Sequence, residues 1–241
     1  MNSKHKQEKV AEREAELIDI AHDIVTKDGF AGLTMDKLVN ASPYSKGTIY
    51  NHFSSKEDLI SALSTHSLSL LIEMFKKLED FDGNSREHVL AVHFTYQLYC
   101  QLEPTLFLCV LSARTPAVME KTSPERNAII KKKELEVTAM CDHAFQQGLA
   151  DGSLKLSTGV AMHDLVFASW ATGFGTNALL INAKAVEGVS RLEQKYALLR
   201  NVNFLLDGMQ WQPLSSEFDY HDTWKKLELF FADYLKLLEE R

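Results

Sequence analysis

The sequence is poor in cysteine. Cys100, Cys109 and Cys141 are the three in the chain, and no pair has the CxxC spacing of a metal or redox site. An odd number of scattered cysteines argues against a disulfide framework. Residues 1–11 are charged and lack the apolar stretch of a secretory signal peptide. We therefore expect a cytoplasmic protein whose thiols are reduced.

Long apolar runs are absent too. A membrane-spanning helix needs roughly 20 consecutive apolar residues, and the nearest approach, residues 164–185, is interrupted by Gly, Thr, Ser and Asn. No segment alternates apolar and polar residues over the length of a strand, and no internal repeat occurs. These absences exclude a membrane span and a β-sheet.

Signatures of enzyme sites are missing as well. The chain has no glycine-rich phosphate loop, no nucleophile elbow and no HExxH sequence. The cysteines lie in apolar surroundings, which raise the pKa of a thiol and leave it unreactive. The pairs His88/His93 and His143/His163 do not have the i, i+4 spacing of a metal site. We expect no catalytic residues, no metal and no cofactor, and therefore not an enzyme.

Charge is distributed unevenly. The net charge of −7 is unfavourable for a nucleic-acid binder, because Lys and Arg supply most of the affinity for phosphates. Residues 1–56, however, contain eight basic and eight acidic side chains, so the remaining 18 basic and 25 acidic ones carry the whole net charge. A neutral N-terminal head on an acidic body permits DNA binding if its basic side chains share one face, but does not itself indicate it.

Apolar residues recur at helical spacing along the whole chain. The pattern predicts an all-α protein: a three-helix head, residues 1–56, followed by a larger helical domain, residues 57–241. A charged arm to residue 7 is expected to be disordered, to lie near DNA or to be a frayed terminus. Helices are expected over residues 8–28, 34–41, 45–53, 56–80, 86–102, 105–113, 125–147, 159–183, 188–206 and 220–239, with a loop or broken helix near 114–124.

Residues 33–59 hold the most informative pattern. Thr34 is a good N-cap for a helix of roughly two turns, and Met35 and Leu38 recur at helical spacing. Pro43 lacks a backbone N–H and disfavours the α region for the residue before it, so the chain must turn there. Ser45 can then cap a second helix. Two short helices joined by a tight turn are the helix-turn-helix arrangement, in which the second helix enters the major groove.

These residues resemble the TetR (TetR/AcrR, tetracycline-repressor) family of bacterial transcription regulators. The resemblance rests on Thr34, Met35, Leu38, Val39, Ser45, Gly47, Ile49, Tyr50, His52, Phe53, Ser55, Lys56, Glu57 and Leu59, in register with the family pattern. Pro43 stands where the family usually has glycine, and Val39 where it usually has alanine. The resemblance implies double-stranded DNA as a partner, a second copy of the chain, and an unknown small-molecule effector.

Site residues follow from the same resemblance. It implies that phosphates are held by Thr34, Tyr50, His52 and Lys56, and that base edges are read by Ser45, Lys46, Thr48 and Asn51. The alternative is that Tyr50 belongs to the core and His52 is an ordinary surface group. Gly47 would cost roughly 1 kcal/mol inside a helix, so its presence suggests a close approach, either of DNA or of another helix.

The body offers two further expectations. Residues 160–181 and 188–206 carry more apolar surface than one partner covers, and in the resembled family two late helices form the dimer; the alternative is a monomeric core. Aromatic and polar side chains could form an effector pocket, although aromatic residues at helical spacing more often fill a core. The candidates are Phe94, Tyr99, Phe107, His143, Phe145, Trp170 and Phe174.

We therefore expect a ligand-responsive transcription repressor that binds a palindromic operator as a homodimer. The alternative is a helical small-molecule or protein-interaction module without specific DNA binding. Exposure of the second short helix separates the two, because burial of Lys46, Thr48 and Asn51 inside the protein would exclude DNA reading.

Overall fold

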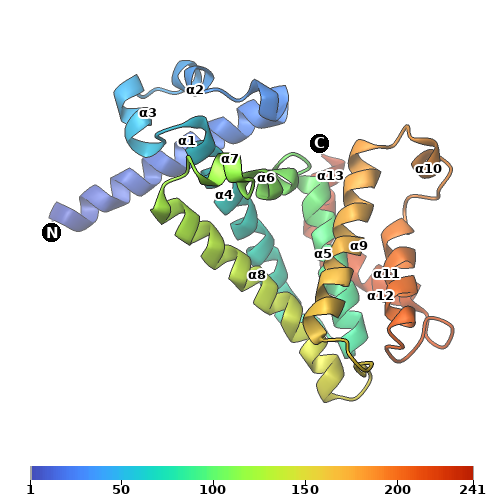
Figure 1. The fold of residues 1–241 in the computed structure, drawn as a ribbon. Helices are drawn as coiled ribbons and strands as arrows, with labels where there is room; N and C mark the ends of the chain where they lie inside the picture. Colours follow the sequence, from blue (N-terminus) through green and yellow to red (C-terminus); the bar gives the residue numbers. More distant parts are fainter. Residues whose placement is uncertain (1, 241) are drawn as a thin grey trace. The chain divides into compact units, whose positions relative to one another are not determined.

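The computed structural model describes residues 2–240, with side chains from His5 onward. Over this range the chain is α-helical without a strand, which confirms the predicted fold class (Figure 1). The helices are α1 Asn2–Gly32, α2 Met35–Ala41, α3 Lys46–His52, α4 Lys56–Lys76, α5 Ser85–Leu102, α6 Leu106–Ala113, α7 Pro116–Met119, α8 Pro124–Ala150, α9 Met162–Asn182, α10 Glu187–Ser190, α11 Ala197–Gly208, α12 Tyr220–Phe230 and α13 Ala232–Glu239. A 3₁₀ turn, Lys77–Asp80, extends α4. Among these helices none combines the length and apolarity that a bilayer crossing requires.

The chain folds into two compact units. The first contains residues up to Leu70 together with Glu103–Glu134, and the second contains Leu71–Leu102 together with the residues from Leu135 onward. Helices α4 and α8 each contribute one part to each unit. The first unit therefore holds α1, α2 and α3 as well as α6, α7 and the beginning of α8.

The core of the first unit begins on one face of α1. Leu17, Ala21 and Val25 are fully buried at a spacing of four residues, whereas Ile20 and Ile24 are half-buried. Leu33, Leu38, Ile49, Phe53, Leu59 and Leu63 complete this core. Helices α1, α2 and α3 are therefore held together by apolar packing.

For α1, the sequence correctly predicted the interruption near its end but not the position of its start. The predicted interruption at Gly29 is present, because this residue has φ 68° and ψ 176° inside the assigned helix. The expectation of a disordered arm before residue 8 was wrong, since the helix begins at Asn2. Charged residues such as Lys6 and Lys9 are compatible with a helix even where no apolar pattern predicts one.

The corner between α2 and α3 follows the sequence closely. The Thr34 hydroxyl accepts the N–H of Lys37 at 3.1 Å, and the Ser45 hydroxyl accepts the N–H of Thr48 at 3.2 Å. Ser42, immediately before Pro43, is extended, with φ −96° and ψ 147°. Helices α2 and α3, each capped at its start and joined by a short turn, therefore form a helix-turn-helix.

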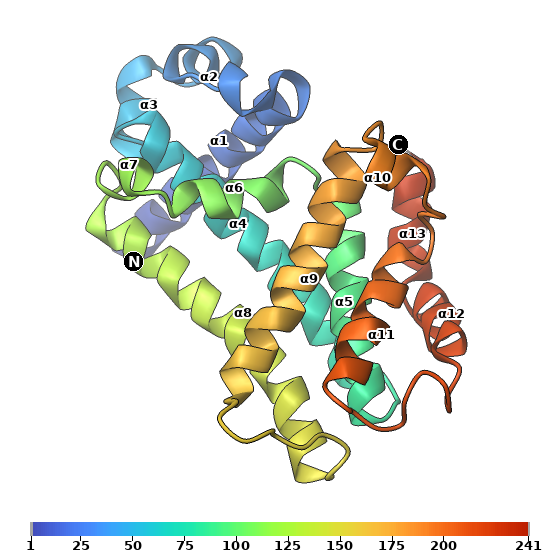
Figure 2. The ribbon, with the colours of Figure 1, turned by 45° about the vertical axis from the view of Figure 1, so that its right-hand side comes forward.

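The second unit is built on α5, against which α9, α11, α12 and α13 all pack. Figure 2 shows α9 and α11 running beside it. Its buried Arg86 donates to the carbonyls of Trp211 and Pro213, to the amide oxygen of Asn203, and to Asp207 at 2.7 Å. This one side chain fixes the loop after α11 to the beginning of α5.

The predicted helix over residues 188–206 was wrong, because it is broken. α10 ends at Ser190 and α11 begins only at Ala197. The Glu193 carbonyl is satisfied by the guanidinium of Arg200 rather than by a helical N–H. Likewise the predicted helix over residues 220–239 bends at Phe231, where φ is −104° and ψ is 25°.

Candidate nucleic-acid interface

The second helix of the helix-turn-helix, α3, has one buried and one exposed face. Ile49 and Phe53 are fully buried, whereas Lys46 and Asn51 are exposed and Thr48 is half-buried. Tyr50 is 40% exposed, so it does not belong to the core. Burial of the polar face of α3 would have excluded DNA reading. This face is instead accessible.

Hydroxyl groups gather at the start of the two short helices. Ser45 Oγ lies 3.0 Å from Thr48 Oγ1, and both side chains are near the surface. Thr34 is exposed at the start of α2 while it caps that helix. A hydroxyl has one donor and two acceptor positions, so capping still leaves hydrogen-bonding capacity for a further partner.

Lys46 is held only loosely. Its Nζ lies 3.4 Å from Asp36 Oδ1 and 5.7 Å from the centre of the Tyr50 ring. The Lys46 side chain is 65% exposed and that of Asp36 80% exposed. Exposed ion pairs of this kind contribute little, so the ammonium can exchange its partner for a phosphate at small cost.

His52 and Lys56 have internal partners. The His52 side chain is 7% exposed, and its Nδ1 lies 3.3 Å from Glu14 Oε2. Lys56 Nζ donates to the carbonyl of Phe30 at 3.1 Å, beside the break at Gly29. His52 is thus neither an exposed donor nor the ordinary surface group of the alternative interpretation, and its phosphate role stays a prediction from resemblance.

Gly47 lies on the open side of α3. A Cβ added there would meet a single neighbour, Ser45 Oγ, at 4.0 Å. No other helix approaches this position within the described part of the chain, so the helix-contact explanation for Gly47 is excluded. What remains is room for something outside the chain to come close.

The remaining acidic groups near the two short helices are largely paired. Lys37 lies 2.7 Å from Asp28, and its hydrogen bond holds the pKa of that carboxyl below its usual value. The Tyr44 hydroxyl donates to Glu16, and the Arg13 guanidinium lies 5.2 Å from the Tyr44 ring centre. Tyr44, which the sequence did not single out, therefore ties the corner to α1.

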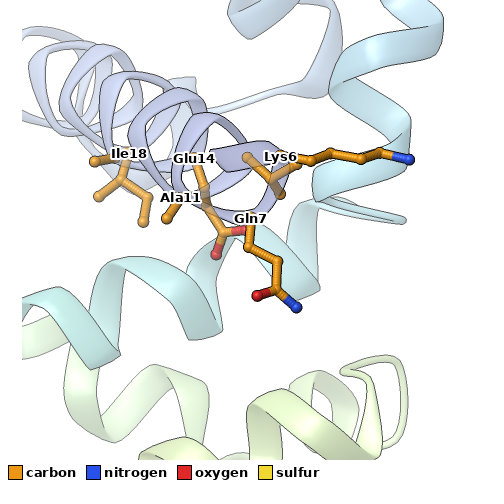
Figure 3. Close-up of a pocket in the computed structure, with 7 residues that line it drawn as sticks. Lys6, Gln7, Ala11, Glu14 and Ile18 are labelled. Atoms are coloured by element: carbon orange, nitrogen blue, oxygen red, sulfur yellow. The ribbon is translucent and has the colours of Figure 1, made fainter. Parts of the chain in front are cut away.

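A groove of about 620 Å³ follows the N-terminal half of α1, lined by residues from Lys6 to Ile18 (Figure 3). Figure 3 shows Glu14 leaving α1 on the face that also carries Ala11 and Ile18. Glu14 is also the partner of His52 and of Arg126 from α8. Arg126 lies far from the short helices in the sequence, and nothing in its local pattern marks it.

The residues proposed for an effector pocket differ in burial and in the unit to which they belong. The second unit contains a cavity of about 280 Å³, and of the seven candidates only Phe94 lines it; Leu98, Trp224, Gln97 and Lys195 are among its other lining residues. Tyr99, Phe107 and Phe145 are buried, and Phe107 belongs to the first unit. His143 and Trp170 are exposed, and Phe174 is half-buried.

The cysteines are not poised for chemistry. Burial raises the pKa of the Cys109 and Cys141 thiols to about 12 and raises that of Cys100 further. Across residues 5–240 no group of three His, Cys, Asp or Glu side chains could hold a metal ion.

Comparison with known proteins agrees with this geometry. The profile of the family described as "Bacterial regulatory proteins, tetR family" matches residues 17–63, which contain the helix-turn-helix. Residues 17–63 thus carry the DNA-binding segment of the TetR family. An HTH-type transcriptional regulator of Staphylococcus aureus (strain bovine RF122 / ET3-1) is 29% identical over 93 residues, 38% of this chain and 50% of that protein. A second, from Staphylococcus aureus (strain USA300), is 27% identical over 95 residues, 39% of this chain and 51% of that protein. The chain thus spans about half the length of the curated relatives it matches.

Solved structures of bacterial regulators share the fold. A bacterial regulatory protein of the tetR family from Rhodococcus RHA1 has a TM-score of 0.61 at 15% identity, covering 82% of this chain and 96% of its own. The transcriptional regulator FadR from Bacillus subtilis in complex with stearoyl-CoA has a TM-score of 0.55 at 18% identity, covering 81% and 96%. The match of the family model to residues 17–63 confirms the resemblance inferred from residues 34–59, and the solved structures confirm the all-helical fold.

Proposed function

We propose that the protein is a sequence-specific DNA-binding transcription regulator that represses its target as a homodimer on a palindromic operator. The observation that carries this proposal is the polarity of α3, whose Ile49 and Phe53 are fully buried while Lys46 and Asn51 face outward. A capped helix of this kind can enter the major groove, where the edges of bases differ in donors and acceptors.

The roles proposed for the residues are those that the family resemblance implies, and the exposure of Lys46, Asn51 and Tyr50 is compatible with them. Lys46, Thr48 and Asn51 on α3, with Ser45 at its cap, are the proposed base readers, and Tyr50 and Thr34 are the proposed phosphate contacts. Lys56 and His52 complete the proposed set, although each has an internal partner.

A homodimer is supported by apolar side chains that a single chain leaves uncovered. Phe167 on α9 is 64% exposed and Phe204 on α11 is 71% exposed, and Trp170 and Leu179 on α9 are also exposed. Exposed large apolar side chains favour association with a partner. Leu199, Val202 and Leu206, which lie in the segment 188–206 predicted to form the dimer, are buried inside the second unit.

A small-molecule effector is supported by the 280 Å³ cavity of the second unit and by the neighbour FadR, which was solved with stearoyl-CoA. An effector would release DNA only if it bound more tightly to a conformation that fits the operator poorly. We further propose that residues 1–56 bind DNA, that residues 57–241 bind the effector and dimerise, and that the protein is cytoplasmic and not an enzyme.

The decisive experiment is selection of bound sites from random DNA by the full chain, followed by measurement of affinity at several salt concentrations. A regulator yields one palindromic sequence that it binds far more tightly than random DNA, with an affinity that falls steeply with salt. Enrichment of no sequence at any salt would instead identify an effector-binding or protein-interaction module.

Variants within this experiment test the site. Lys46→Ala and Tyr50→Ala should each weaken operator binding about tenfold, while the melting temperature changes by no more than a few degrees. Lys226→Ala, which removes an exposed lysine on α12, is the matched control and should bind like the parent protein. Unfolding of the head by Tyr50→Ala would contradict the proposed role.

A further inference from the structure

Arg126 lies in the first turn of α8, yet its side chain contacts three other elements of the first unit. Nη2 donates to the carbonyl of His52 at 2.8 Å, Nη1 lies 3.0 Å from Glu14 Oε1, and Nε lies 3.3 Å from Asp58 Oδ2. The guanidinium carbon lies 4.8 Å from the centre of the Phe53 ring. One side chain thus joins the end of α3 to α1 and to the first turn of α4.

The contact with His52 occurs where α3 most needs it. The last carbonyls of a helix have no intrahelical partner, and a cation there complements the helix dipole. Helix α3 has seven residues, fewer than an isolated helix needs for stability in water. Its geometry therefore depends on tertiary contacts, and at its C-terminal end Arg126 and Glu14 supply charged ones.

Arg126, Glu14, Asp58 and His52 form a cluster whose polar side-chain groups are paired within the protein. Asp58 is buried and also accepts the N–H groups of Ser54 at 3.2 Å and Ser123 at 3.3 Å. Glu14 offers one carboxylate oxygen to Arg126 and the other to His52 Nδ1. The Arg126 side chain is 15% exposed, and each of its three nitrogens has a partner, so it is not available to contact a phosphate.

We propose that Arg126 is a positioning residue for DNA recognition. It fixes the C-terminal end of α3 against α1 and α4 and thereby sets the orientation of the face that carries Lys46, Thr48 and Asn51. This inference rests on the proposed DNA-binding function, because orientation of that face matters only if it reads an operator.

The main test compares Arg126→Met with the parent protein. Methionine keeps an unbranched side chain over Phe53 but loses the hydrogen bond and both ion pairs, and Asp58 retains its two backbone donors. We expect operator affinity to fall about tenfold or more. Backbone hydrogen exchange should become faster in α3 and remain unchanged at Leu17, Val25 and Leu38 of the neighbouring core, because α3 alone loses a fixed end.

Two further variants keep the test decisive. Arg114→Met breaks an ion pair with Glu134 in the same unit that does not reach the short helices, and it should leave affinity and α3 exchange unchanged. Glu14→Gln removes one charge of the cluster from a partly exposed position and should produce a smaller loss that is not additive with that of Arg126→Met. If Arg126→Met fails to fold, the Glu14→Gln result decides.

Several results would overturn the proposal: unchanged α3 exchange, exchange that accelerates equally throughout the first unit, or an equal loss of affinity in Arg114→Met. Failure of the proposed function is distinguishable, because it appears as absence of specific DNA binding in the parent protein. The exchange measurements need no DNA and would still support or reject the role of Arg126 in fixing α3.

Discussion

At the residue scale, the open space around Gly47 bears on why a glycine stands in α3. Glycine is an unfavourable residue for a helix, and a Cβ at this position would meet no atom closer than 4.0 Å. The chain itself therefore gives no reason to avoid a side chain there. A DNA backbone lying against the first turn of α3 would give one.

Gly47→Ala should accordingly separate stability from binding. We expect the melting temperature to stay constant or to rise by a few degrees, because alanine favours the helix by up to about 1 kcal/mol. Operator affinity should fall about tenfold, since the added methyl group occupies the space that the DNA needs. Thermal unfolding and band-shift titration measure the two effects, and unchanged affinity would show that the glycine is merely tolerated.

His93 provides a test by pH. Its Nε2 lies 2.8 Å from Ser169 Oγ, and burial lowers the pKa of the imidazole from 6.5 to about 4. Between pH 6.5 and about 4 the imidazole binds a proton in the unfolded chain but not in the folded chain. The contribution of the neutral His93 to the free energy of unfolding is therefore fully present above pH 6.5 and decreases as the pH falls toward 4. The free energy of unfolding should fall by up to about 3 kcal/mol through this window.

Urea denaturation at neutral and mildly acidic pH measures this effect. His93→Gln can still hydrogen-bond to Ser169 but does not titrate, so its stability should depend less on pH. Some dependence should remain, because burial also lowers the pKa of His88. An equal pH dependence in both proteins would show that another group is responsible.

At the scale of elements, the sequence predicted what local chemistry determines. The caps Thr34 and Ser45, the corner at Pro43 and the interruption at Gly29 were all visible because each depends on a residue and its immediate neighbours. The break between α10 and α11 was not, because the apolar spacing of residues 189–206 continues through it. Helix α11 packs on α9 and α5, and such contacts between distant segments are not visible in the spacing.

The candidate site shows the same division. Ile49 and Phe53 are four residues apart, so they share the buried face of the helix, and Lys46 and Asn51 are exposed. This spacing can be read directly from the sequence. The internal partners of His52 and Lys56 could not be predicted, since Glu14 and Phe30 approach them only through the fold. Arg126 was missed for the same reason.

The proposed dimer helices can be tested through Phe204. It is 71% exposed on α11, so glutamate there should not disturb the core. We expect Phe204→Glu to elute as a monomer in size-exclusion chromatography and to bind operator about a hundredfold more weakly, because two linked half-sites are then bound independently. Leu229→Glu, equally exposed on α12, is the control, and a dimer that persists in Phe204→Glu would remove this residue from the interface.

At the scale of the whole molecule, the charge distribution separates the two proposed tasks. Residues 1–56 are neutral overall, and the rest of the chain carries the net charge of −7. An acidic body repels DNA phosphates, so attraction has to come from the few basic groups on the exposed face of the head. Affinity should then depend on correct geometry more than on bulk charge.

Operator spacing tests that dependence. A two-fold dimer presents its α3 helices to successive major grooves, so the half-site centres should lie about one helical turn, roughly 34 Å, apart. Inserting five base pairs between the half-sites turns one of them to the opposite side of the duplex. We expect band-shift affinity to fall about a hundredfold, and an operator that tolerates the insertion would contradict a rigid symmetric dimer.

The brevity of α3 has a last consequence. Seven residues are about half of what a free helix requires, so a synthetic peptide copied from this segment would be mostly uncoiled in water and would compete poorly for the operator. The peptide would lack the contacts that Glu14 and Arg126 make with the end of α3, and these contacts come from distant parts of the chain.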